Sequence, residues 1–159
     1  MTTKDEIDKV IEFIKLNAKE IIEERGEEHF PIMFMFTPTE LKIIGIELTD
    51  ETKELYKPGI TALLRHSDAD AYITINEAWQ HSTNGDTETS KRIMSGQTRV
   101  SELPLDDRQE ILIIMAVKNN EFAEMHSSII VHTDDDRRLL CEWEKMDGVG
   151  DGRMIIKEW

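Results

Sequence analysis

Glu77, Trp79, His81 and Arg108 are the residues whose types and spacing suggest chemistry in this sequence. The first three alternate along the stretch Ile73–His81, which predicts an extended strand, so their side chains point to one side of it. An aromatic ring can stack on a ligand, and an arginine beside it can hold an anion. These four residues are therefore the candidate ligand-binding pocket.

The carboxylate of Glu77 shares its side of the strand with Ile73 and Ile75, where an unpaired charge would be costly to bury. If the next strand runs back antiparallel, it begins near Arg108, which can bind a carboxylate through two parallel hydrogen bonds. A structural ion pair between Glu77 and Arg108 is therefore the first interpretation, and it would anchor the chain that joins the two strands. A solvated strand end and a binding site are the alternatives.

A small metal-dependent or acid–base hydrolase is the alternative function, with Glu77 and His81, joined by His126 or His132, as its reactive groups. On an extended strand Glu77 and His81 lie roughly 13 Å apart, so a shared metal would require the strand to end early. His126 and His132 fall on a polar side of their strand, where solvated histidines are expected. We expect no metal site and no cofactor.

Charge and composition narrow the kinds of partner. The 159 residues include 33 Asp and Glu against 19 Lys and Arg, for a net charge of −14, and 39% of them are hydrophobic. This size and hydrophobic content predict one domain over residues 1–159. The spread of acidic residues disfavours nucleic acid as a partner. Simple solubility, a basic protein partner and mimicry of DNA charge remain as explanations of the acidity.

No apolar run approaches 18 residues, and charged residues closely follow Met1, so neither a membrane span nor a signal peptide is predicted. The single cysteine, Cys141, excludes an intrachain disulfide. We expect a soluble cytoplasmic protein that binds a protein or a small ligand and does not bind a membrane.

The N-terminal segment predicts a long amphipathic helix. Apolar residues recur at helical spacing from Ile7 to Ile22, with charged residues between them. Thr3 and Glu6 fit a capping box at its start, and Gly26 can take the left-handed conformation that ends it. A second helical stretch runs from Asp50 to about Arg65, but it contains Pro58, which predicts a kinked helix or two short pieces.

Strands account for most of the remaining chain. The expected strands cover residues 30–36, 41–48, 69–80, 110–118, 122–133, 138–144 and 154–159. The first two should form a hairpin around the turn at 37–40, and Asn119 with Asn120 can supply positive φ angles to another. Residues 81–107 form a long, mostly polar connection, and connections of this length are usually functional or disordered.

A three-residue turn, Asp134–Asp136, gives the most consistent register for the hairpin that follows. It places Met125, Ile129 and Val131 on the side of Leu139, Cys141 and Trp143, and that side is expected to face the core. The opposite, polar side gathers Glu124, His126, Ser128, His132, Arg138, Glu142 and Glu144. Together, the elements predict an α+β fold: a mostly antiparallel sheet of six to seven strands, a hairpin plus a meander, with two helices packed on one face.

Three short segments of the chain resemble one family. They are AYITINEAW at 71–79, VSELP at 100–104 and DRQEIL at 107–112. These segments are similar to a group of short prokaryotic and phage proteins that is uncharacterised, whose members show a strand ending in Ser-Glu-Ala-Trp, a polar loop and Asp-Arg-Arg-Glu before an apolar strand. Asn76 stands in place of the serine, and Gln109 in place of the second arginine.

The resemblance covers residues 70–117 well and the rest of the chain only by the order of its elements. It implies a prokaryotic source and implies that Glu77, Trp79 and Arg108 belong to one local unit, but the family supplies no established activity. We therefore expect a non-enzymatic binding or protein-interaction module that uses residues 81–107 and the adjoining strand ends, with the hydrolase as the alternative.

Overall fold

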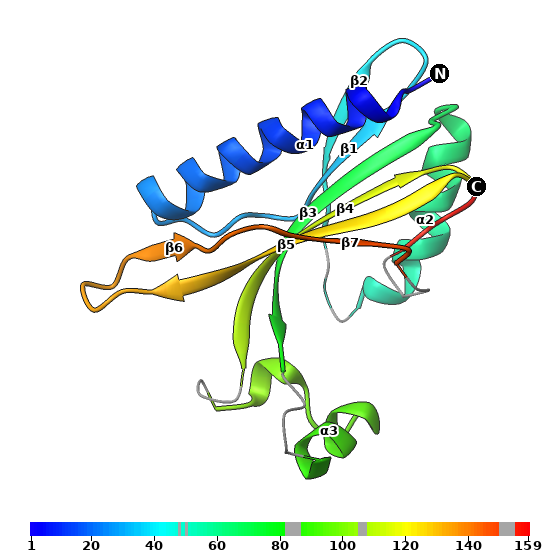
Figure 1. Cartoon of the computed structure of the whole chain (residues 1–159). Helices are drawn as coiled ribbons and strands as arrows, with labels where there is room; N and C mark the ends of the chain where they lie inside the picture. The colour runs from blue at the N-terminus through cyan, green and yellow to red at the C-terminus, as the bar shows by residue number, and fades with distance from the viewer. Residues whose placement is uncertain (48, 50, 82–86, 105–107, 150–154) are drawn as a thin grey trace.

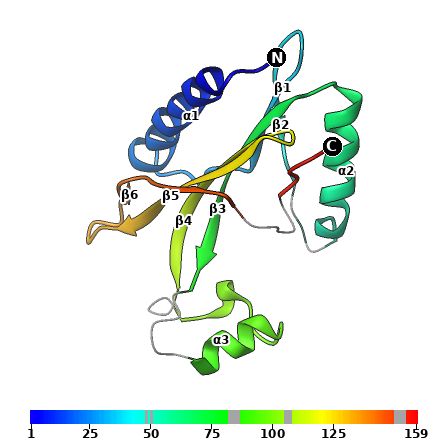
Figure 2. The same ribbon diagram turned by 45° about the vertical axis from the view of Figure 1, so that its right-hand side comes forward.

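The computed structural model describes residues 1–47, 49, 51–81, 87–104, 108–149 and 155–159. Its centre is a seven-stranded antiparallel sheet of order β2-β1-β3-β4-β5-β6, in which β7 also pairs with β5 (Figures 1 and 2). The strands are β1 (Ile32–Phe36), β2 (Leu41–Gly45), β3 (Ala71–Gln80), β4 (Gln109–Lys118), β5 (Phe122–His132), β6 (Arg138–Leu140) and β7 (Glu144–Asp147). The predicted α+β class and antiparallel sheet are confirmed.

The N-terminal helix forms where the sequence predicts it. Helix α1 (Lys4–Lys19) continues into a π-helical turn, η1 (Glu20–Glu24). Its first turn carries the full capping box, in which the Thr3 side chain accepts from the Glu6 amide and the Glu6 side chain accepts from the Thr3 amide. Gly26 has a φ of +64°, in the left-handed region that favours glycine, and the chain leaves the helix there.

The two long helices cover opposite faces of the sheet. Helix α1 buries Ile7, Ile11 and Ile14 in one core cluster with Phe34, Ile73 and Ile114. Helix α2 (Lys53–His66) buries Leu64 in a second cluster with Met33, Tyr72 and Val117. Since successive strand residues point to opposite faces, these clusters lie on the two sides of the sheet. The prediction that both helices pack on one face is therefore wrong, because the central strands are apolar on both faces and each face needs a cover.

Helix α2 is a single α-helix with Pro58 in its second turn, so of the two predicted alternatives, a kinked helix or two short pieces, the division into two pieces is wrong. The proline removes only one backbone donor, and packing of Tyr56 and Leu64 on the sheet holds the helix together on both sides of it. Thr52 precedes its first residue, and the expected cap, Asp50, lies outside the described residues.

The hairpins predicted around residues 37–40 and around Asn119 and Asn120 are both present, but the backbone of the second turn differs from the prediction. Strands β1 and β2 pair Phe36 with Leu41 around the turn at 37–40. In the turn between β4 and β5, Asn120 has a φ of +62°, and Asn119 does not have a positive φ.

Residues 155–159 form no strand, contrary to prediction. Instead, the Tyr72 hydroxyl donates to the Ile156 carbonyl and accepts from the Ile156 amide, each at 3.0 Å, which fixes this segment against the sheet.

The β5–β6 register is the predicted one, with Val131 opposite Leu139, but the expected core side is wrong. Glu124, His126 and Ser128 are buried together with Ile130. These residues lie under α1, so the side that looked polar and solvated in the sequence is the covered one.

The long connection between β3 and β4 is partly helical. It contains α3 (Thr87–Met94) and a short 3-10 turn, η2 (Val100–Glu102), while residues 82–86 and 105–107 lie outside the described part. Figures 1 and 2 both show α3 beyond the end of the sheet, away from α1 and α2. Among the described residues, no helix is both long enough and apolar enough to cross a membrane.

Candidate functional site

Trp79 and Arg108 meet where β3 ends and β4 begins. The Arg108 guanidinium carbon lies 4.0 Å from the centre of the Trp79 ring, a cation–π contact. The same guanidinium donates to the Ser101 carbonyl in η2. The two residues therefore join the base of the α3 segment to the sheet, a role that the sequence analysis assigned to an ion pair between Glu77 and Arg108.

Glu77 is bound by Arg138 of β6, so the predicted ion pair with Arg108 is wrong. Arg138 Nη2 donates to Glu77 Oε1, and the backbone amide of His29 donates to Glu77 Oε2 at 2.9 Å. The β3–β4 register explains the error, because it places Glu77 opposite Leu112. Arg108 is four residues before Leu112, roughly 13 Å along an extended strand, and so lies beside Trp79 instead.

Arg138 is the centre of a charged cluster on this face. Its guanidinium also lies 3.5 Å from Glu110 Oε1 and donates to the Glu27 carbonyl at 3.0 Å. Glu110 Oε2 in turn is 2.5 Å from His132 Nε2. The side chains of Glu77, Glu110 and Arg138 are 12–19% exposed, so this cluster is largely shielded from solvent.

This geometry leaves Glu77 poorly suited to act as a general base. Both of its carboxylate oxygens already accept hydrogen bonds from the protein, one of them from a charged arginine, so neither oxygen is free to accept a proton from a substrate. Strand β3 also runs on to Gln80, so it does not end early enough to bring Glu77 and His81 to one metal ion. Within the described ranges, no three His, Cys, Asp or Glu side chains converge in a metal-binding arrangement.

Neither a protein-family model, nor a curated protein, nor a solved structure matches the chain. The resemblance to the prokaryotic and phage group therefore stays a prediction.

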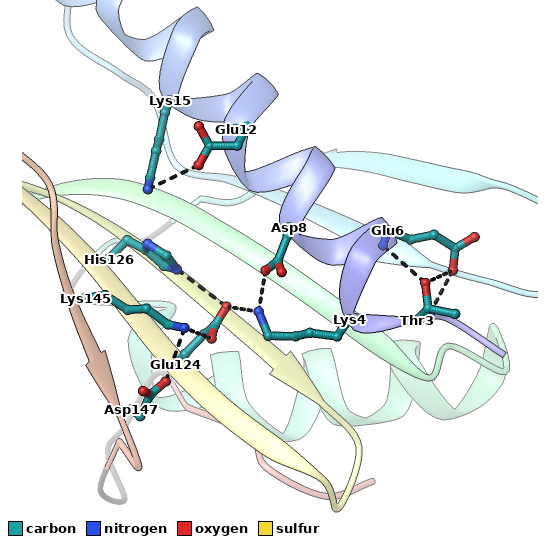
Figure 3. A network of polar contacts seen from close by, with 10 residues as sticks. All are labelled: Thr3, Lys4, Glu6, Asp8, Glu12, Lys15, Glu124, His126, Lys145 and Asp147. Atoms are coloured by element: carbon teal, nitrogen blue, oxygen red, sulfur yellow. Dashed lines mark hydrogen bonds and ion pairs between the residues drawn. The ribbon is translucent and has the colours of Figure 1, made fainter.

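A second polar cluster, centred on Glu124, lies between α1 and the sheet (Figure 3). Glu124 is only 2% exposed, and its carboxylate lies 3.0 Å from Lys4 Nζ and 3.3 Å from Lys145 Nζ. His126 Nε2 is 3.4 Å from the same carboxylate. The two lysines come from α1 and β7, so Glu124 ties the N-terminal helix to β5 and to the edge of the sheet.

The electrostatics of this cluster follow from burial and pairing. Burial alone would raise the pKa of Glu124, but hydrogen bonds from Lys4 and Lys145 outweigh it and hold the pKa below its ordinary value. Burial, assisted by the charge of Lys15, lowers the pKa of His126. Burial opposes the charge on Lys4, but hydrogen bonds to Asp8 and Glu124 leave its pKa raised.

A cavity of about 510 Å³ adjoins Glu124, and Lys4, Phe122 and Lys145 contribute to its wall. Hydrogen bonding to Glu124 raises the pKa of Lys145, and the pKa of Lys4 is raised as well, so neither amine is available as a neutral nucleophile near neutral pH. The cluster is therefore best described as a structural network around the buried carboxylate of Glu124.

Sequence reasoning missed Arg138, Glu124 and Lys4 as partners in these clusters. The usable signal was the unbroken alternation of polar residues at even positions of β5, Glu124, His126 and Ser128. A polar stripe that faces a lysine-bearing helix can be buried, provided that each charge on it finds a partner. Arg138 was placed on the correct side of its strand but was treated as solvated.

Proposed function

We propose that the protein is a non-enzymatic interaction module that binds another protein through the α3 segment, residues 87–104. The observation that carries this proposal is the position of Met94. It ends a helix that stands off the end of the sheet, and its side chain is 88% exposed. Methionine is flexible and polarisable, so it adapts well to an apolar pocket on a partner.

The segment is organised enough to present this side chain. Leu103 and Thr89 are both buried, so part of the segment is packed and not fully exposed to solvent. The Trp79–Arg108 contact fixes the base of the segment to two adjacent strands. A fixed base reduces the conformational entropy lost when a partner binds.

The charge of the segment differs from that of the whole chain. Residues 87–104 carry three basic side chains, Lys91, Arg92 and Arg99, against Glu88 and Glu102, whereas the chain has a net charge of −14. A partner surface with an apolar pocket next to acidic groups would therefore suit α3. We place this interaction in the cytoplasm of a prokaryotic cell as part of the same proposal.

The hydrolase alternative finds less support in the geometry. A hydrolase needs a carboxylate or an imidazole that is free to move a proton, and Glu77 already binds Arg138 and the His29 amide. The same two contacts suit a role in holding the strand ends that carry the α3 segment.

A photo-crosslinking amino acid at position 94 tests the proposal. Leu55 on α2 is the matched control site, because its apolar side chain is also highly exposed, at 68%. We expect specific adducts in cells from position 94 that position 55 does not give. The purified partner should then lose binding to Met94→Asp, while the unfolding midpoint of that variant stays unchanged. The same adducts from both positions, or none from position 94, would contradict the proposal.

A further inference from the structure

The two edges of the sheet are protected very differently. One edge is formed by β7 and β6. Three of the four residues of β7 are charged, and β6 is only three residues long. The Leu140 amide of β6 also donates to the Glu23 carboxylate of η1 at 3.2 Å, so the end of the N-terminal helix covers this strand. Charge, shortness and cover are the usual means of preventing edge-to-edge pairing.

The opposite edge, β2, is less protected, because it is longer than β6 and less charged than β7. Its five residues, Leu41–Gly45, include one charged side chain, Lys42. Ile43 is 65% exposed and Leu41 is 41% exposed, on the face of the sheet that α1 covers further in. Strand β1 pairs with one side of β2, and no described strand pairs with the other.

The backbone groups on the outer side of β2 can be assigned from its pairing with β1. The Thr37 amide donates to the Glu40 carbonyl, and the Ile46 amide donates to the Pro31 carbonyl. Hydrogen-bonded pairs alternate along an antiparallel ladder, so Lys42 and Ile44 also point their backbone groups towards β1. The amides and carbonyls of Leu41, Ile43 and Gly45 therefore point outward.

We propose that two copies of this chain pair antiparallel through their β2 edges, about a two-fold axis at Ile43. In this register Ile43 lies opposite Ile43 of the other copy, and Leu41 lies opposite Gly45 of the other copy. All three outward amides and all three outward carbonyls of each strand then find partners. The proposal is independent of the α3 interaction surface.

The side chains of β2 fit this register without rearrangement. The position that a Cβ would occupy on Gly45 has no heavy atom within 4 Å, so the glycine leaves room for the leucine opposite it. The two Ile43 side chains meet at the axis and shield each other from water. On the other face, the aliphatic stem of Lys42 lies over Ile44 of the other copy. A self-complementary edge of this kind favours a second copy over an unrelated strand.

Interface size and charge define the expected behaviour of the dimer. A ladder of five residues spans about 17 Å, and it buries less than the roughly 800 Å² per partner of a standard stable interface. The dimer should therefore be weak and reversible. Each copy has a net charge of −14, so the copies repel each other, and association should strengthen as salt screens this repulsion.

Sedimentation velocity of the full chain over a wide range of concentrations tests the proposal. The mass should rise from the 18.4 kDa monomer towards twice that value, and more readily at high salt. Ile43→Pro removes an outward amide that β1 does not use, and Ile43→Lys adds charge at the axis. Both variants should weaken association at least tenfold, whereas Leu55→Lys, at an equally exposed apolar position of α2, should not.

Amide hydrogen exchange supplies a residue-level readout. With rising concentration, the Leu41, Ile43 and Gly45 amides should gain protection, whereas the Lys42 and Ile44 amides should be protected throughout. A monomer at every concentration would overturn the proposal, as would a dimer that Ile43→Pro leaves intact. Association that weakens with salt would instead indicate pairing of unlike charges and would also count against it.

Discussion

Arg138 of β6 binds Glu77 of β3, although two strands, β4 and β5, separate them in the order of the sheet. The contact is possible because the sheet curls and brings β6 back over the face that α1 covers (Figure 1). The backbone of residues 27–29 joins the same contact through the Glu27 carbonyl and the His29 amide. One ion pair thus links the N-terminal helical region, a central strand and an edge strand.

Glu77→Gln should lower the free energy of unfolding by about 1.5–3 kcal/mol, the usual range for a hydrogen bond to a charged group. Urea unfolding at neutral pH measures the change. Glu102→Gln is the control, because Glu102 pairs with Arg99 at 3.9 Å on the surface and its loss should change little. A variant of Glu77 with unchanged stability and a lost enzymatic activity would favour the hydrolase instead.

Glu124 should make the protein sensitive to acid. Its pKa in the folded protein is lowered from the ordinary value of 4.5, so the unfolded chain binds a proton first as the pH falls. The stability that Glu124 contributes is fully present above 4.5 and is lost as the pH falls through the lowered folded value. Glu124→Gln should be less stable at neutral pH by about 1–3 kcal/mol. Below pH 4.5 it should lose less stability than the original protein, in urea titrations at each pH.

His126 should also make the protein less stable as the pH falls, but in a higher pH range than Glu124. Burial lowers its pKa from 6.5 in the folded state, so protonation favours the unfolded chain, and stability should decline as the pH falls below 6.5. His126→Gln stays neutral and should flatten this decline. Burial also lowers the pKa of His29, so the single variant should remove only part of the slope. An unchanged slope in thermal unfolding between neutral and mildly acidic pH would contradict this assignment.

Arg108→Gln should loosen the α3 segment without unfolding the sheet. The variant loses the cation–π contact with Trp79, which is worth about 0.5–1 kcal/mol at an exposed site. Trypsin should then cut faster after Lys91, Arg92 and Arg99, while the global unfolding midpoint changes little. Arg65→Gln, on α2, is a control that should leave the cleavage rate at these sites unchanged. A large fall in the midpoint would show that the sheet depends on the segment.

Gly59→Ala should stabilise the protein by about 0.5–1 kcal/mol, because alanine is the better helix former. Gly59 lies within α2, and the position of its missing Cβ has no heavy atom within 4 Å. Gly26→Ala is the opposite control: Gly26 also has open space but has a φ of +64°, so alanine should destabilise the protein there. Thermal unfolding of the two variants should move in opposite directions.

Local patterns predicted most elements of the fold. The capping box at Thr3 and Glu6, the Phe36–Leu41 hairpin and the Val131–Leu139 register all depend on residues close in sequence, and all three are present. Pro58 left open whether α2 is kinked or divided, and the helix stays undivided because its packing on the sheet outweighs the loss of one backbone hydrogen bond.

Which face of the sheet each helix covers was less predictable from the sequence, because it depends on contacts between distant segments. Residues 110–118 are apolar on both sides of the strand, so both faces of the sheet have to be covered. The partner of Glu77 could not be found from the β3–β4 hairpin, since Arg138 arrives from a strand 61 residues later. Trp79 and Arg108 were expected in one local unit with Glu77; these two residues are in contact, whereas Glu77 is bound by Arg138.

The β3–β4 hairpin closes on its own before the α3 segment begins. Gln80 lies opposite Gln109 in the register, and their side chains hydrogen-bond at 2.8 Å. Since loop-closure entropy grows only slowly with length, this junction can accommodate segments of very different size and sequence without disturbing either core. The pairing of β3 and β4 should therefore stay intact when the length or the sequence of the connection between them is changed.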